Sequence, residues 1–121
     1  MPVVNTSPFE IISEPIPGGL FRVRLAGEFD MSVGDVLSKA LVDAARHPGV
    51  TAVVVDLGRT SFLDSHGVAG LVAGYEAAAR AGRHFTAVNA RGLVKDVLDI
   101  TGLSEVLLDR DHPAAPADPA S

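Results

Sequence analysis

The sequence feature that most constrains the fold is an apolar strand followed by a polar turn and a helix of small residues. Residues 51–57 (Thr-Ala-Val-Val-Val-Asp-Leu) form a β-branched run of the length expected for a strand buried on both faces. Residues 67–80 then repeat apolar side chains three or four apart, which is the spacing of one helix face. This order predicts a strand in the middle of a sheet, with the helix packed on that sheet.

The polar turn between them, residues 62–68, contains Asp64, Ser65 and His66. If the helix begins at or just after Ser65, its first backbone N–H groups and the positive end of its dipole lie at this serine. Serine is a favoured N-cap residue, and a phosphate is tolerated at the start of a helix. The residues alone leave both roles open for Ser65.

The rest of the chain alternates between strand and helix patterns. Residues 15–19 (Pro-Ile-Pro-Gly-Gly) predict a hairpin turn, because proline fixes φ and glycine permits positive φ. Asp30 or Ser32 is expected to cap the first helix, whose apolar stripe includes Val36. The expected strands are 9–13, 20–25, 51–57, 84–88 and 105–108, and the expected helices are 33–45, 67–80 and 91–100.

These patterns predict the α/β class, with a mixed sheet of about four to five strands that begins with an antiparallel hairpin and continues in β-α units. Residues 1–108 are expected to form one domain. Residues 109–121 are rich in proline and alanine without apolar periodicity, and we expect a disordered tail there. Asp30 and Asp64 both stand at strand-to-helix junctions, so parallel strands would bring them to the same edge of the sheet.

Composition narrows the classes of partner. The formal net charge of −5 repels phosphate backbones and anionic lipid, and an aromatic content of 5% provides little surface for stacking bases. The chain contains no cysteine, which excludes thiol catalysis and disulfides. No apolar run approaches the ~18 residues of a membrane span, and the first residues lack a signal pattern. We therefore expect a cytoplasmic protein that binds a protein or a small molecule, without direct nucleic-acid binding or membrane insertion.

Residues capable of chemistry are present, but not in a catalytic arrangement. Asp64, Ser65 and His66 include the residue types of a hydrolase triad, yet three consecutive side chains cannot face one another in that geometry. Asp30 and Asp64 fit an acid–base pair, a metal pair or two cap residues. The remaining histidines are isolated and lack the spacing of metal ligands. We expect no catalytic residue, no metal and no cofactor.

Three glycines, Gly67, Gly70 and Gly74, follow the polar turn. They lack the leading Gly-x-Gly that lets a backbone approach a dinucleotide. Their spacing favours a smooth helix side, against which another segment of this chain or a docking partner packs closely.

Four stretches together resemble the STAS domain, and specifically the bacterial anti-sigma factor antagonists. They are residues 25–30 (Leu-Ala-Gly-Glu-Phe-Asp), 54–57 (Val-Val-Asp-Leu), 62–68 (Phe-Leu-Asp-Ser-His-Gly-Val) and 94–103 (Val-Lys-Asp-Val-Leu-Asp-Ile-Thr-Gly-Leu). They follow the family's order and spacing over about residues 20–108. The Asp-Ser turn combined with the Thr-Gly-Leu ending is the specific part of the resemblance.

The resemblance implies a non-enzymatic switch that binds an anti-sigma factor serine protein kinase and so frees a sigma factor. It makes Ser65 the residue that this kinase phosphorylates, and a serine phosphatase restores it. The resemblance places Asp30, Asp64, His66 and Gly67 on the partner-binding surface. The family usually carries serine or threonine after the phosphoacceptor, where this chain has His66.

The same family also implies two alternatives. One is a scaffold that binds without phosphorylation, as in stressosomes or as a subunit of lipid-transport complexes. The other is a module that binds a nucleotide or another small ligand.

Overall fold

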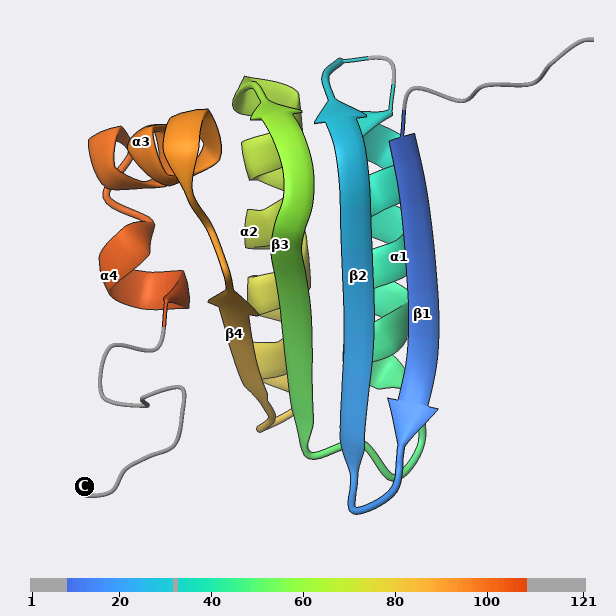
Figure 1. The fold of residues 1–121 in the computed structure, drawn as a ribbon. Coiled ribbons are helices and arrows are strands. Elements are labelled where there is room, and N and C mark those ends of the chain that lie inside the picture. The colour runs from blue at the N-terminus through green and yellow to red at the C-terminus, as the bar shows by residue number, and fades with distance from the viewer. Residues whose placement is uncertain (1–8, 32, 109–121) are drawn as a thin grey trace, which may run out of the picture.

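The computed structural model describes residues 9–31 and 33–108 (Figure 1). The strands are β1 (Phe9–Ile16), β2 (Leu20–Phe29), β3 (Ala52–Leu63) and β4 (His84–Val88). The helices are α1 (Gly34–Arg46), α2 (Ser65–Arg80), α3 (Gly92–Ile100) and α4 (Ser104–Leu107). Ser32, one of the two expected caps, and the expected tail at 109–121 lie outside the described residues.

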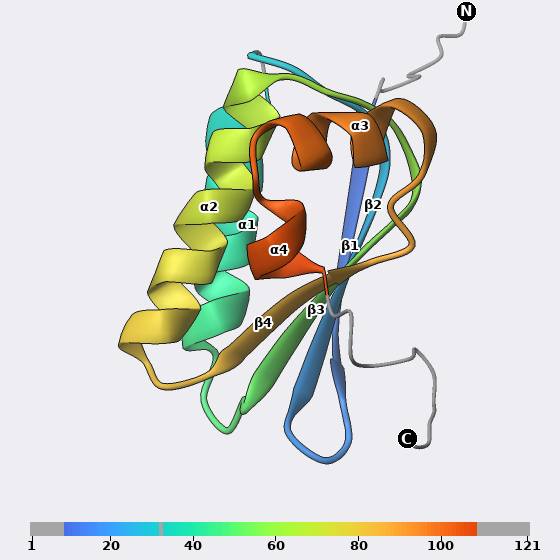
Figure 2. The ribbon, with the colours of Figure 1, turned by 90° about the vertical axis from the view of Figure 1, so that its left-hand side faces the viewer.

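The strands form one mixed sheet in the order β1-β2-β3-β4. β1 pairs with β2 in antiparallel orientation, and β3 is parallel to both β2 and β4. The α/β class, with an N-terminal hairpin followed by β-α units, is therefore confirmed. Figure 2 shows α1 and α2 on one side of the sheet, while no described helix covers the opposite face of β1 and β2.

The core lies between the sheet and the pair of helices α1 and α2. Inward side chains of the two central strands are fully buried, among them Val23, Leu25, Val53 and Val55. Burial of one such side chain contributes about 1.5–3 kcal/mol, so this layer is the main source of stability. α3 packs against β3, beyond the end of the short strand β4 (Figure 1).

β3 extends six residues past the expected end at 57, because its register against β2 shifts twice. The pairs that bracket the two shifts are Arg24 with Asp56, Ala26 with Arg59, Gly27 with Thr60, and Glu28 with Phe62. Each shift inserts one extra residue into β3, which is a β-bulge. Inward side chains therefore follow three apart, at Leu57, Thr60 and Leu63, instead of two apart. This broken alternation is why the sequence pattern predicts a loop there.

β1 is also longer than expected, since Pro15 and Ile16 belong to the strand and not to the turn. β1 is an edge strand, where a proline without an N–H group is tolerated. The turn is made by Gly18 and Gly19, which have φ values of 97° and 88°. The expected strand at 84–88 matches β4.

Two details of α1 correct the sequence-based expectation. Val33 is the N-cap residue, and no side chain caps the helix there. Asp30 is therefore not the N-cap residue, and its backbone carbonyl accepts from the N–H of Val33 at 3.1 Å. Val36, expected on the buried stripe, is 50% exposed. The buried face starts at Gly34, which has no apolar side chain to mark it in the sequence.

The expected edge strand at 105–108 is wrong. Residues Ser104–Leu107 form the short helix α4, and only Leu108 pairs with the sheet, through a single parallel bridge to Ala87. The helical turn buries Leu107 and leaves Val106 46% exposed. Four residues are too few for their pattern to separate a strand from a helical turn. The apolar pattern of residues 91–100 predicts that Leu93 also points inward, but it is 53% exposed on α3.

The junction between α3 and α4 is held by Asp99, which accepts hydrogen bonds from Ser104 and Lys95. The Ser104 hydroxyl, followed by Lys95, lowers the pKa of the Asp99 carboxyl below its usual value. A carboxyl with a lowered pKa in the folded state contributes stability above its unfolded pKa. That contribution is lost as the pH falls through the folded pKa.

Substituting Ser104→Ala is therefore expected to raise the pKa of Asp99 toward its ordinary value, because the largest cause of the shift is removed. An NMR titration of the Asp99 carboxyl measures this change. Ser61→Ala, on β3, serves as a control that leaves the titration of Asp99 as it is in the parent protein. An unchanged pKa in Ser104→Ala would contradict the assigned cause.

Candidate functional site

The site begins where two parallel strands end side by side. Phe29, the last residue of β2, pairs with Leu63, the last residue of β3. The N–H of Asp64 donates to the carbonyl of Phe29 at 3.3 Å. Asp30 and Asp64, the next residues of the two strands, therefore follow adjacent strand ends at one edge of the sheet, as the sequence predicts.

Asp64 is the N-cap residue of α2. Its backbone is extended, with φ −105° and ψ −168°, and its Oδ1 accepts from the N–H groups of His66 at 2.8 Å and Gly67 at 3.2 Å. The interpretation of Ser65 as the N-cap residue is thus wrong, because the carboxylate one position earlier already binds the free amides of the helix start.

Ser65 is the first residue of α2 and is exposed. Within the described residues its hydroxyl makes no hydrogen bond. The hydroxyl therefore lies at the helix start without serving the fold. Of the two roles that the sequence left open, capping of the helix is therefore excluded, and Ser65 is exposed to solvent.

Asp64→Ala is expected to lower the free energy of unfolding by about 1 kcal/mol, since two amides lose their acceptor. Ser65→Ala is the matched control one residue away and is expected to change stability by less than about 0.5 kcal/mol. Chemical denaturation of the two variants measures both values. An equal loss in the two variants, or a loss in Ser65→Ala alone, would contradict the assignment of Asp64 as the cap.

The glycine-lined side of α2 faces the interior. A Cβ at Gly67 would lie 2.5 Å from Cδ1 of Leu63 and 2.7 Å from the carbonyl oxygen of Phe29. Gly70 and Gly74 approach α1 in the same way, against Leu37 and Leu41. Of the two interpretations of these glycines, close packing within the chain is therefore correct. Gly67 is buried, so its expected place on the partner-binding surface is corrected.

His66 lies next to Ser65 and is positioned by α1. A Cβ at Gly34 would lie 3.1 Å from Cβ of His66, so the start of α1 touches the first turn of α2. Nδ1 of His66 is 3.8 Å from Oδ1 of Asp64, and the His66 side chain is 54% exposed. The imidazole therefore lies at the surface beside Ser65, where any partner that contacts the serine would meet it.

Exposed apolar side chains occur on the segments that flank Ser65, and the sequence pattern did not predict their exposure. Met31 follows β2 and is 70% exposed, Phe62 near the end of β3 is 37% exposed, and Val36 lies in the first turns of α1. Exposed large apolar residues are enriched at sites of protein association. The sequence signal for these exposed residues is their position, because each lies near the end of a strand or the start of a helix.

The Ser65 hydroxyl has no hydrogen-bonded base in the described part of the chain. Residues 9–31 and 33–108 also hold no group of three or more histidine, aspartate or glutamate side chains placed to bind a metal ion. None of the described helices is long and apolar enough to cross a membrane.

Comparison with known families identifies the domain. The sequence profile of the family described as "Mlab, STAS domain" matches residues 13–109. The chain belongs to the STAS domain family. The match covers all of β2 to α4 and part of β1. No curated protein matches the sequence of this STAS protein.

Solved structures of STAS proteins share its fold. The anti-sigma factor antagonist SpoIIAA in its unphosphorylated form has a TM-score of 0.72 and 22% identity, over 83% of this chain and 87% of SpoIIAA. SpoIIAA of Bacillus in its phosphorylated form has a TM-score of 0.62 and 25% identity, over 83% of this chain and 90% of that chain.

An anti-sigma factor antagonist from Mycobacterium paratuberculosis has a TM-score of 0.68 and 27% identity, over 82% of each chain. A sulfate transporter family protein from Wolinella succinogenes has a TM-score of 0.65 and 19% identity, over 78% of this chain and 75% of that chain. The similar structures therefore include anti-sigma factor antagonists and a sulfate transporter family protein.

Proposed function

We propose that this STAS protein is an anti-sigma factor antagonist that binds a kinase-type anti-sigma factor and is switched off by phosphorylation of Ser65. The observation that carries this proposal is that Asp64 and Ser65, adjacent at the start of α2, have different roles. Asp64 caps the helix, while the exposed Ser65 hydroxyl has no hydrogen bond among the described residues. Phosphorylation of Ser65 therefore removes no hydrogen bond on which the fold depends.

The docking surface in this proposal consists of Asp30, Asp64, Ser65 and His66 together with the exposed apolar residues Met31 and Phe62. It combines an apolar area with acidic groups around it, which suits a protein partner better than a small substrate. The antagonist from Mycobacterium paratuberculosis supports this function, as does the existence of SpoIIAA in phosphorylated and unphosphorylated forms.

The proposal gives the protein no catalytic role of its own. The anti-sigma factor is the serine protein kinase, a serine phosphatase reverses its action, and the sigma factor is regulated through competition for the kinase. This exchange takes place in the cytoplasm. Cross-linking in a cell extract, followed by identification of the captured protein, tests the proposal, and we expect a kinase-type anti-sigma factor.

Capture of a transport ATPase instead would support the alternative role as a non-phosphorylated transport or scaffold subunit. The similarity to a sulfate transporter family protein from Wolinella succinogenes is the observation that favours this second candidate.

We further expect the cognate kinase to modify Ser65 alone. Thr60 is buried, and its hydroxyl donates to the carbonyl of Leu25 at 3.2 Å, so a kinase cannot reach it. Ser61 is exposed but lies within β3, where the backbone is held in the sheet. Phosphopeptide mapping of the parent protein, with Ser61→Ala as the control that keeps full labelling, measures this selectivity. Label on Ser61 or Thr60 would contradict the assignment.

A further inference from the structure

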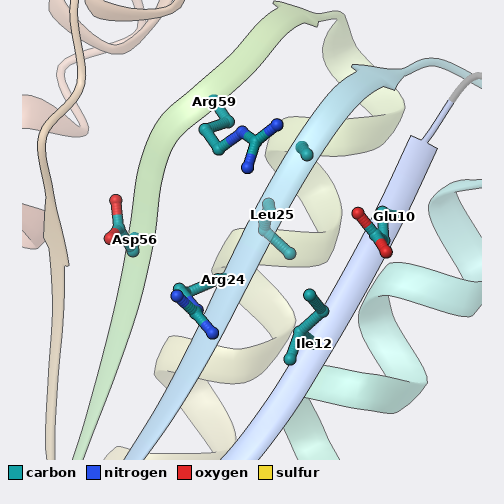
Figure 3. A pocket seen from close by; sticks show the side chains of 7 residues that line it. Glu10, Ile12, Arg24, Leu25, Asp56 and Arg59 are labelled. Atoms are coloured by element: carbon teal, nitrogen blue, oxygen red, sulfur yellow. The ribbon is translucent and has the colours of Figure 1, made fainter.

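A second surface of interest lies on the face of the sheet that α1 and α2 do not cover. Strands that pair in parallel are usually covered on both faces, yet this side of β2 and β3 carries no described helix (Figure 2). A hollow of about 150 Å³ opens there, and Figure 3 shows the side chains around it. The residues that line the hollow include Glu10, Ile12, Arg24, Ala26, Asp56 and Arg59.

The hollow coincides with the first β-bulge of β3. Arg24 pairs with Asp56 and the next outward residue of β2, Ala26, pairs with Arg59, so the inserted residue lies between the two β3 residues that line the hollow. Bulges re-aim side chains and are frequent next to functional sites. Without the insertion, strict alternation would not place Arg59 and Asp56 on the same face. Figure 3 shows the Arg59 guanidinium directed from β3 over β2.

The charged groups around the hollow do not neutralise one another. Arg59 has no carboxylate oxygen within 4.0 Å in the described chain. Glu10 likewise has no arginine, lysine or histidine nitrogen within that distance. Arg24 reaches only Glu14, at 3.6 Å, and Arg22 holds that carboxylate at 2.8 Å. Two guanidinium groups are therefore available to a carboxylate ligand.

The acidic groups make a purely anionic ligand a poor match. Asp56 Oδ1 accepts from the N–H of Gly58 at 2.9 Å and from the side-chain amide of Asn89 at 3.0 Å, so its hydrogen-bond partners are neutral groups. Glu10 adds a second carboxylate on β1. Ile12, 40% exposed, supplies an apolar surface between the charged groups. The hollow thus offers cations, anions and an apolar wall within a small volume.

We propose that this hollow binds a small zwitterion, namely an aliphatic α-amino acid. Its carboxylate is bound by Arg59 and Arg24, its ammonium group by Glu10, and its side chain packs on Ile12. A hollow of about 150 Å³ accommodates a group of roughly the size of benzene, so the side chain of valine or leucine fits there while the polar groups reach the charged residues around it. This site is separate from Ser65 and does not depend on the proposed antagonist function.

Backbone amide NMR with L-leucine as the probe tests the proposal. We expect saturable shifts centred on Ile12, Arg24 and Arg59 at millimolar concentrations. Two analogues separate the contributions, since 4-methylpentanoate lacks the ammonium group and 3-methylbutylamine lacks the carboxylate. Both are expected to bind at least tenfold more weakly than L-leucine.

Arg59→Gln is expected to weaken L-leucine binding at least tenfold while leaving the melting temperature unchanged. Arg80→Gln, which removes an exposed arginine from α2, is the matched control and should bind as the parent does. Absence of shifts at the hollow would overturn the proposal, as would equal binding of L-leucine by Arg59→Gln and the parent. If 4-methylpentanoate bound as tightly as L-leucine, the hollow would be a simple anion site and the zwitterion assignment would be wrong.

Discussion

Replacing Gly67 by alanine is expected to lower the free energy of unfolding by about 2 kcal/mol, although alanine is the better helix former. The added Cβ would lie 2.7 Å from the carbonyl oxygen of Phe29, which belongs to the end of β2 and cannot rotate away. Alanine gains about 1 kcal/mol of helix propensity, so the steric cost must exceed that gain. Chemical denaturation of the variant measures the net change.

The other glycines of α2 provide a graded comparison. Gly74→Ala meets Cβ of Leu41 at 2.7 Å, whereas Gly70→Ala meets only the Leu37 side chain at 3.0 Å and is expected to cost less. Ala69→Ser changes an exposed position of the same helix and should leave stability within about 0.5 kcal/mol of the parent. A Gly67→Ala variant as stable as the parent would show that α2 and the strand ends are not in close contact.

Replacing Ser65 by aspartate is expected to weaken binding to the kinase-type anti-sigma factor about a hundredfold or more while the fold remains intact. In the proposed complex the new carboxylate is desolvated beside Asp64. Like charges juxtaposed in an interface cost several kcal/mol, and each ~1.4 kcal/mol is a factor of ten in affinity. The fold is spared because Asp64 binds the cap amides, so the new charge replaces no contact of the folded state.

Titration calorimetry against the partner, with thermal melts alongside, separates these two effects. Ser65→Ala is the matched control, and it should bind as the parent does because it adds no charge. Ser61→Asp places the same charge within β3, four residues before Ser65, and should weaken binding less. Binding of Ser65→Asp at parental affinity, or a loss that merely accompanies unfolding, would exclude the electrostatic switch.

Much of the fold could be predicted because the apolar pattern is regular where the strands are regular. The strand at 84–88 alternates without interruption and coincides with β4. The parallel pairing of β2 and β3 follows from the helix between them, and it brings Asp30 and Asp64 to one edge as expected. The Asp-Ser turn at Ser65, combined with the Thr-Gly-Leu ending at 101–103, also predicted the STAS family, which the family match confirms.

The remaining features depend on contacts that a single strand or helix does not reveal. The two bulges of β3 exist only relative to β2, so the sequence alone could not show that Thr60 lies in a strand. The buried faces of α1 and α2 include glycines, which carry no apolar side chain for a periodicity to detect. Asp64 and Ser65 are adjacent and are both favoured caps, and only the backbone geometry distinguishes them.

The most direct test of the proposed function measures the affinity of one kinase-type anti-sigma factor for three forms of this protein. The forms are the unmodified protein, the protein phosphorylated on Ser65, and the phosphorylated protein after treatment with a serine phosphatase. We expect tight binding, a loss of about a hundredfold or more, and recovery of the original affinity, in that order. Equal affinity of the unmodified and phosphorylated forms would contradict the proposal that Ser65 is the switch.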